Sequence, residues 1–155
     1  MTNSYDAMAE LSQLGQSVPI PATPDAAYLE AISFPNDDHA LLVRLSCPEF
    51  TSVCPVTGQP DFAHFVIDYV PNGHLIESKS LKLFMASFRS HAAFHEQVTA
   101  YIGQRLLKAL QPAWLRVNAY WFPRGGIPID VFWEHGDKPD KLHVPLIDIP
   151  TYRAR

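Results

Sequence analysis

The feature that most constrains the fold is a change of hydrophobic period along the chain. Residues 62–70 (FAHFVIDYV) alternate with period two, which is typical of a strand with two different faces. Beyond the turn at Pro71-Asn72-Gly73, apolar residues recur every three or four positions. This spacing predicts two amphipathic helices, over about 77–90 and 93–110.

Further strands are predicted on both sides of the helical pair. Residues 27–34 and 40–46 are rich in Leu, Ile and Val, and a Pro-Asn-Asp-Asp turn between them predicts a hairpin. Aromatic and β-branched residues favour strands at 114–122 and 129–135, paired through a Pro-Arg-Gly-Gly turn. The pattern predicts an α+β fold in which two helices cover one face of an antiparallel sheet.

The chain of 155 residues is expected to form one domain. Residues 1–24 are polar and punctuated by three prolines, which predicts an N-terminal arm, and 25–137 form the folded domain. Residues 138–155 are expected to be an irregular tail laid on the surface of that domain. The segment 47–61 is crowded with Pro, Gly, Thr and Ser and is predicted to be an irregular loop. A Rossmann domain is disfavoured because no GxGxxG motif follows a strand.

Composition narrows the class of function. Twelve Lys and Arg against sixteen Asp and Glu give a net charge of −4, without the basic excess needed to neutralise a long nucleic acid. The two cysteines are too few for a disulfide scaffold. No segment has the pattern of a signal peptide or a membrane span. These features predict a cytoplasmic protein with no direct nucleic-acid or membrane partner.

One candidate for chemistry is Cys54, with Asp61 seven residues later. A cysteine on a loop reaches solvent, and the turn-forming Thr57-Gly58-Gln59-Pro60 could bring the carboxyl group back near the sulfur. A thiol beside a carboxyl group suits addition to an electrophilic carbon followed by proton transfer. The alternatives are a small buried cysteine and a carboxylate that caps a helix or strand.

A second candidate is the start of the first helix, ESKSLKLF. Lys79 and Lys82 lie on one face, where two like charges are easier to explain if an anion bridges them. The alternative is a solvated lysine face. Glu77 falls on the apolar side, although it could also complement the helix dipole.

A third candidate is His95-Glu96 at the start of the second helix. Glu96 could accept hydrogen bonds from the N–H groups of a purine-like ring, or could serve as a helix cap. Arg124 lies at a hairpin tip, where two glycines let the backbone approach a ligand closely. The other histidines have no HxH or HExxH spacing and receive no role. A zinc site built from Cys47, Cys54 and a histidine lacks any short ligand spacing, so no metal is expected.

In this order and at these separations, the motifs EFTSVCPVTGQPDFA, ESKSLKLF, FHE and FPRGG resemble a known family. It is the single-domain form of the NADPH-dependent 7-cyano-7-deazaguanine reductases of queuosine biosynthesis, and the resemblance covers about residues 25–137. It implies a tunnelling fold, an antiparallel sheet with helices whose subunits join their sheets into barrels. It also implies a homo-oligomer with its sites at subunit interfaces.

The resemblance also implies roles for individual residues. Cys54 would attack the nitrile carbon to give a covalent thioimide, and Asp61 would protonate the nitrile nitrogen. Two NADPH molecules would then supply two hydrides. The positions that match substrate contacts are Glu77, His95 and Glu96, and those that match NADPH contacts are Lys79, Ser80, Lys82 and Arg124.

Two other classes of function stay open at this point. A hydrolase resembling GTP cyclohydrolase, on the same fold, would need bound zinc and a ring-opening water. A purine-binding oligomer without catalysis would keep Glu96 while Cys54 stays inert. The pairing of Cys47 with Cys54 in a disulfide is also left open by the sequence.

Overall fold

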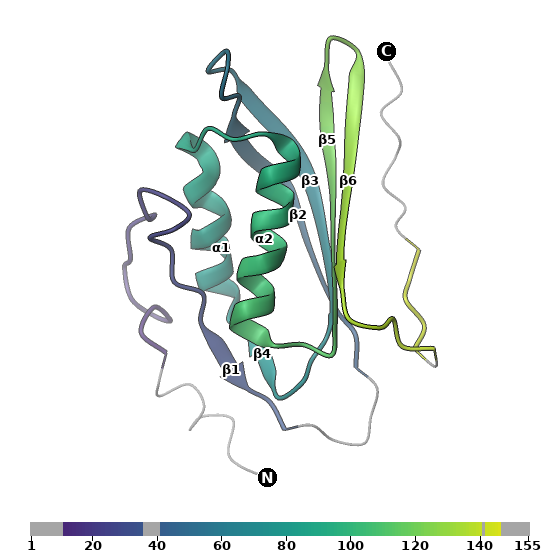
Figure 1. Ribbon diagram of the computed structural model, residues 1–155. Helices are drawn as coiled ribbons and strands as arrows, with labels where there is room; N and C mark the ends of the chain where they lie inside the picture. The colour runs from purple at the N-terminus through teal and green to yellow at the C-terminus, as the bar shows by residue number, and fades with distance from the viewer. Residues whose placement is uncertain (1–10, 36–40, 141, 147–155) are drawn as a thin grey trace.

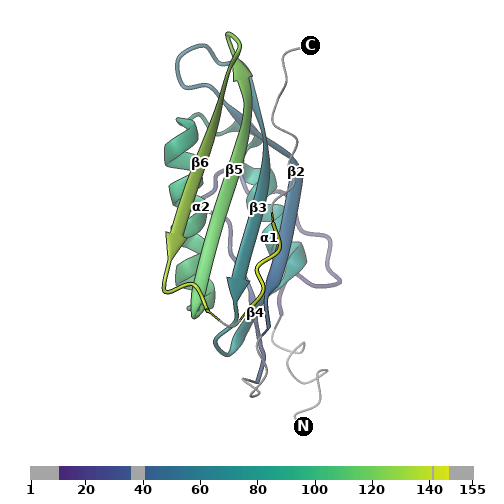
Figure 2. The same cartoon turned by 90° about the vertical axis from the view of Figure 1, so that its right-hand side faces the viewer.

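The computed structural model describes residues 11–35, 41–140 and 142–146. Its main element is a four-stranded antiparallel sheet in the order β2-β3-β5-β6, and β1 and β4 form a separate two-stranded sheet. Two helices lie side by side on one face of the larger sheet, whereas Figure 2 shows that its opposite face carries no helix (Figure 1). In chain order the elements are β1 (Ala31–Ser33), β2 (Val43–Val53), β3 (Pro60–Val70), β4 (His74–Ile76), α1 (Ser78–Ala86), the 3-10 helix η2 (Ser87–Ser90), α2 (His95–Leu110), β5 (Trp114–Arg124) and β6 (Ile127–His135).

The core fills the space between the helices and the sheet. On β3, every second side chain points toward the helices, and Phe65, Ile67 and Tyr69 are fully buried there. On α2, Ile102 and Leu106 face them from the other layer and are equally buried. The predicted helical pair and the predicted α+β arrangement are therefore confirmed. No helix in the described parts of the chain is long and apolar enough to cross a bilayer.

The predicted hairpin between residues 27–34 and 40–46 is wrong. β1 pairs with β4, with Ala31 opposite Ile76, and not with β2. The carbonyl of the neighbouring Glu30 accepts a backbone hydrogen bond from the Glu77 N–H, and the Glu30 N–H donates to the Ser80 hydroxyl oxygen. These bonds tie the segment to the start of α1 and so take it away from β2. Residue 40, part of the predicted second strand, lies outside the described residues.

The predicted loop over 47–61 is also wrong over most of its length. β2 continues to Val53 and β3 begins at Pro60, so only residues 54–59 are irregular. The register of the β2–β3 pair shifts between Cys47 and Phe50. A proline lies at this irregularity, because it has no N–H group to donate to the neighbouring strand. Phe50 then returns to the core, where its ring lies 4.5 Å from that of Phe65.

The described part of the tail lies against the sheet face that carries no helix (Figure 2). Asp68 is fully buried there and pairs with Arg44 at 2.6 Å and with Arg116 at 2.7 Å. Arg44 also donates to the backbone carbonyls of Pro145, at 2.7 Å, and Leu146, at 3.2 Å. The buried carboxylate thus orients the arginine that binds the tail.

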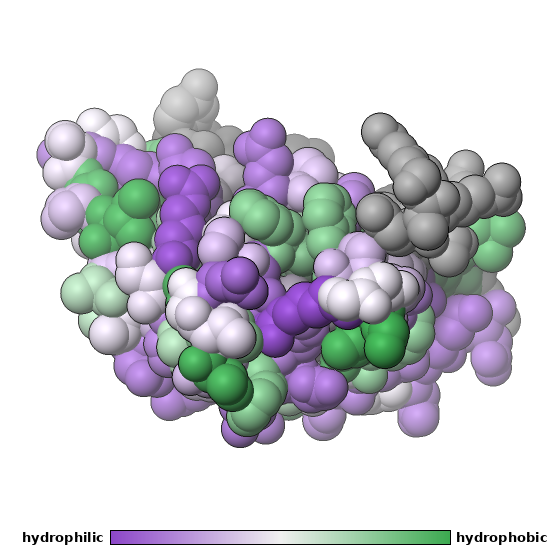
Figure 3. Space-filling view, turned by 90° about the horizontal axis from the view of Figure 1, so that it is seen from above, coloured by the Kyte–Doolittle hydropathy of each residue, from purple (hydrophilic) through white to green (hydrophobic). Residues whose placement is uncertain are grey.

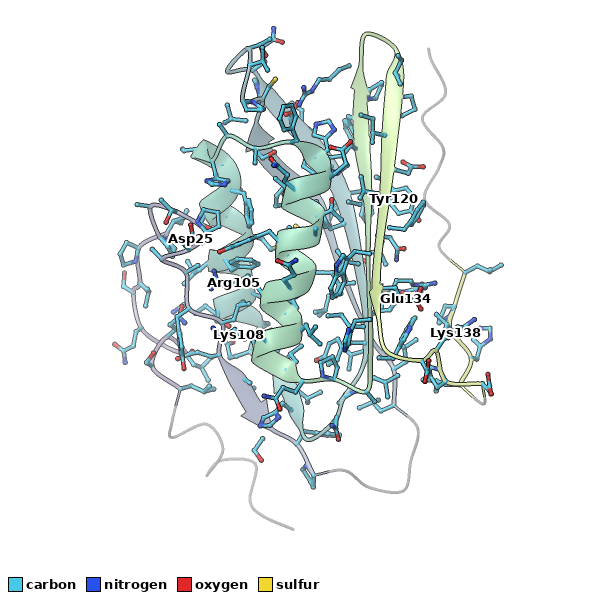
Figure 4. The ribbon with its side chains drawn as sticks, in the orientation of Figure 1. Asp25, Arg105, Lys108, Tyr120, Glu134 and Lys138 are labelled. Atoms are coloured by element: carbon cyan, nitrogen blue, oxygen red, sulfur yellow. The ribbon has the colours of Figure 1, made fainter. Side chains whose placement is uncertain are left out.

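On the helical side, the segment before β1 is attached to α2. Figure 4 shows Arg105 pointing from α2 toward the chain around Asp25. Its guanidinium donates to the carbonyl of Pro24 at 2.7 Å and also to that of Ala27. The described residues that precede β1 therefore follow the outer surface of the two helices.

Candidate active site

The site begins at the tight turn that links β2 to β3. The Cys54 N–H donates to the Gln59 carbonyl at 2.8 Å, and the Gly58 N–H donates back to the Cys54 carbonyl at 3.0 Å. Gly58 has a φ of 71°, a conformation that glycine adopts without steric cost. The turn sends the chain directly into β3, so Asp61 follows on the first residues of that strand.

Arg124 brings the predicted nucleophile and the predicted acid together. Its Nη1 lies 3.1 Å from the Cys54 sulfur, and its Nε donates to Asp61 Oδ1 at 2.5 Å. Its Nη2 donates to the other oxygen of the same carboxylate. Cys54 and Asp61 are each only 4% exposed, whereas the Arg124 side chain is 42% exposed. One guanidinium therefore bridges two almost buried groups and closes over them from the solvent side.

His95, on the first turn of α2, completes this cluster. Its Nε2 lies 2.8 Å from Arg124 Nη2 and 3.4 Å from Asp61 Oδ2, and its ring stacks on Trp121 with centroids 4.0 Å apart. Because a guanidinium only donates, Nε2 is the acceptor and the proton of the neutral ring is on Nδ1. Burial lowers the pKa of His95, and the charge of Arg124 lowers it further. The ring is thus a neutral, fixed wall of the site.

The turn also activates the sulfur. The pKa of Cys54 is lowered, first by a hydrogen bond from the Thr57 hydroxyl, then by the backbone N–H groups of Thr57 and Val56, with a smaller contribution from the charge of Arg124. The other cysteine behaves in the opposite way, because burial raises the pKa of Cys47. Both thiols are free. Of the two, Cys54 is the one suited to react as a thiolate.

The end of the molecule that carries this cluster has both charged and apolar side chains exposed to solvent. Seen from above, it presents hydrophobic side chains interspersed among hydrophilic ones (Figure 3). Glu96 is exposed beside His95, on the first turn of α2. Phe94, Phe122 and Ile127, which border the same region in sequence, are each more than half exposed. A planar ring could therefore meet both a free carboxylate and apolar surface here.

The site residues predicted at the start of α1 do not lie beside Cys54. They lie at the opposite end of the helical segment that α1 and η2 form together. Glu77 is buried and caps the helix, because its carboxylate accepts from the backbone N–H groups of Lys79 and Ser80. Ser80 is fully buried, and its hydroxyl donates to the Glu77 carbonyl. The Cys54 turn lies instead near the far end of η2, where Val53 pairs with Ala92. About 20 Å of helix separates the two groups of residues within one chain.

The two lysines are placed differently from one another. The Lys79 ammonium group donates to the backbone carbonyls of Gln13, at 2.5 Å, and Gln16. Lys82 is exposed and lines a cavity of about 450 Å³ between β2 and α1, and Arg89 lines the same cavity. The apolar lining comes from Leu81, Met85, Phe50, Leu45 and Ile67.

Sequence reasoning missed three residues of these sites, namely Thr57, Trp121 and Arg89. Thr57 and Trp121 were visible only as a turn former and a strand residue, and nothing local marks their contact with Cys54 or His95. Arg89 could have been found from its spacing of seven residues from Lys82, which is two helical turns on the same face. Among the described residues, no three His, Cys, Asp or Glu side chains form a group that could hold a metal ion.

Comparison with known proteins gives consistent results. A family model described as "QueF-like protein" matches residues 60–140. The apo crystal structure of the archaeosine synthase QueF-Like has a TM-score of 0.59 and 26% identity, over 63% of this chain and 96% of that one. This likeness, with the antiparallel sheets and paired helices, confirms the expected tunnelling-fold class.

Two curated relatives are similar over almost their whole length. The NADPH-dependent 7-cyano-7-deazaguanine reductase of Chelativorans sp. (strain BNC1) is 58% identical over 94% of this chain and 95% of its own length. The reductase of the same name from Maricaulis maris (strain MCS10) is 57% identical over 99% of this chain and 97% of its own. The chain that carries the Cys54, Asp61, His95 and Arg124 cluster therefore belongs to the family of NADPH-dependent 7-cyano-7-deazaguanine reductases.

Proposed function

We propose that this protein reduces the nitrile group of 7-cyano-7-deazaguanine to an aminomethyl group with two molecules of NADPH, a step of queuosine biosynthesis. The observation that carries the proposal is the Cys54 sulfur. Its own turn lowers its pKa, and the guanidinium that it contacts also binds a carboxylate. This is the pair of groups that addition of a thiol to a nitrile requires.

In the first step Cys54 adds across the triple bond. The S–H bond breaks, the sulfur bonds to the nitrile carbon, and the nitrogen gains a proton, so the product is a covalent thioimide. Asp61 delivers to the nitrogen a proton equivalent to the one that the thiol loses. Two NADPH molecules, bound in turn, would each supply one hydride, and with two protons from solvent these would convert the thioimide into the amine and release Cys54 as the free thiol.

Residues at the start of α2 recognise the deazaguanine ring. Exposed Glu96 accepts hydrogen bonds from the ring N–H groups, because an ionised carboxylate offers acceptors only. His95, held against Trp121, fixes the position of the cyano group relative to Asp61. Glu77, as the buried cap of α1, fixes the start of that helix, which would contribute to the site of another subunit.

Residues from a second copy of the chain complete the site. Glu77 and Cys54 lie far apart within one chain, so one site can contain both only if another subunit supplies one of them. Among the described residues, β2 and β6 are the edge strands of the sheet, so their unpaired backbone groups can bind a strand of another subunit. Edge-to-edge pairing of such strands forms the barrels expected for a homo-oligomer of this fold.

The cavity between β2 and α1 offers a place for part of a phosphorylated dinucleotide such as NADPH. Lys82 and Arg89 supply positive charge, and the apolar side chains of α1 and β2 supply a surface for the rings. Lys79 reaches the same ligand by exchanging the carbonyls of Gln13 and Gln16 for a phosphate oxygen. Buried Ser80 holds the start of the helix that carries both lysines.

The test of this function is the stoichiometry of the reaction. Purified protein with the nitrile and NADPH should consume two NADPH for each nitrile lost. A ratio of one, or no oxidation of NADPH, would contradict the proposal. A zinc hydrolase would instead act without NADPH and lose activity with its metal, and a purine-binding protein would bind the ring without turnover. A free reactive thiol requires a reducing compartment, which supports the cytoplasm as the place of action.

A further inference from the structure

We propose that Arg124 is a positioning residue for the addition step. In the substrate-free protein it holds the Cys54 sulfur and the Asp61 carboxylate, and it withdraws when the nitrile enters. This inference rests on the proposed function, but it gives Arg124 a role other than the contact with NADPH that the family resemblance implies.

The first support is that the whole guanidinium is engaged within the site. Nε and Nη2 bind the two oxygens of Asp61, Nη1 contacts the Cys54 sulfur, and Nη2 also meets His95. A planar fork can make these contacts at one time because its N–H groups have fixed directions. A lysine at this position would have the charge without that geometry.

The second support is the balance of charge. The charged and titratable groups that contact the cluster come from three elements, with Arg124 on β5, Asp61 on β3 and His95 on α2. His95 is neutral here. A thiolate and a carboxylate in a nearly buried site repel one another, and the one positive charge between them offsets that repulsion.

The third support concerns the proton. Both oxygens of the Asp61 carboxyl group accept N–H groups of Arg124, so neither is free to exchange a proton with an incoming group. The proton that the thiol loses on ionising passes to solvent, and Asp61 can take an equivalent proton and pass it to the nitrile nitrogen only after Arg124 leaves. The guanidinium also occupies the space between sulfur and carboxylate that the cyano group needs.

Arg124 is placed where it can withdraw. It ends β5 after a register shift, and Gly125 and Gly126 follow it with positive φ angles of 58° and 82°. Its side chain is the most exposed member of the cluster. It can therefore turn toward solvent without movement of buried backbone.

Thiol alkylation tests the first part of this role without any substrate. Iodoacetamide modification of Cys54 should be followed from pH 5.5 to 9.5, with peptide mass spectrometry to separate Cys54 from Cys47. We expect the midpoint of the Arg124→Ala profile to lie about 0.3–0.5 pH unit above that of the parent, a shift that greater access to the sulfur alone would not produce. Arg124→Lys should fall between them. Lys108→Gln, which removes an exposed cation on the last turn of α2, should match the parent.

Nitrile addition without NADPH tests the second part. Arg124→Ala should lower the limiting rate of addition and also lower the half-saturating nitrile concentration, because no guanidinium has to be displaced. Alkylation of Arg124→Ala with the pH profile of the parent would overturn the holding role. An unchanged or higher half-saturating concentration would overturn the withdrawal. If the parent forms no adduct, the proposed function fails, while the alkylation profiles still decide whether Arg124 holds the thiolate.

Discussion

Replacement of Thr57 by valine isolates the contribution of the turn to the reactivity of Cys54. The side chains have nearly the same shape, and residue 57 is exposed, so the fold should keep its stability within about 0.5 kcal/mol. The hydroxyl is the largest of the influences that lower the pKa of Cys54. After the substitution, the sulfur keeps the two backbone N–H groups and Arg124 but loses its side-chain donor.

The expected magnitude follows from the loss of one hydrogen bond to a charged acceptor. Such a bond changes an equilibrium constant by about tenfold, so the thiolate population of Thr57→Val at pH 7 should fall by up to that factor. Because the turn lowers the pKa, its loss moves the onset of reactivity to higher pH, and the two proteins should converge once both thiols are ionised. Thr57→Ser, which keeps the hydroxyl, is the matched control.

The assay is the rate of iodoacetamide modification of Cys54 against pH, with Cys47 in the same sample as an internal reference. Burial raises the pKa of Cys47, so its modification should begin at higher pH in every variant. If Thr57→Val and Thr57→Ser give the same profile as the parent, the turn does not activate the sulfur and the reasoning is refuted.

Three further predictions concern stability and are checked by thermal unfolding. Asp68→Ala leaves two arginines without their buried partner and should cost about 3–5 kcal/mol, or about 10 °C in Tm for a chain of this length; a loss below 2 °C would contradict the role given to Asp68. Gly103→Ala adds a methyl group that overlaps the Trp133 ring and should cost about 1–3 kcal/mol, so an unchanged Tm would show that the ring moves freely. Glu77→Ala removes the cap of α1 and should cost about 1 kcal/mol, whereas equal stability of the variant would mean that the cap contributes nothing.

The parts of the fold that the sequence predicts are those with a long, uninterrupted period. The helical repeat through Ile102, Leu106 and Leu110 extends for four turns, and the alternation through Phe65, Ile67 and Tyr69 covers most of β3. The pairing of β1 with β4 is not encoded locally. It depends on contacts of Glu30 with residues about fifty positions away. No short sequence pattern predicts contacts between residues so far apart.

The residues of the candidate site also differ in how far the sequence alone predicts their contacts. The turn from Cys54 to Asp61 was predictable because its residues are adjacent in sequence and carry turn signals. Arg124 was recognised as a residue near a ligand, but its contact with Asp61 joins positions 63 residues apart. Burial of Glu77 as a helix cap depends in turn on the packing around α1, since the same residue could equally have faced a ligand.

The most direct test of the account is the intact mass of the protein after incubation with 7-cyano-7-deazaguanine in the absence of NADPH. The parent should gain the mass of one nitrile molecule on Cys54, and Cys54→Ala should gain nothing while it still binds the ring. A gain that persists in Cys54→Ala, or none in an active parent, would contradict the claim that this sulfur is the nucleophile.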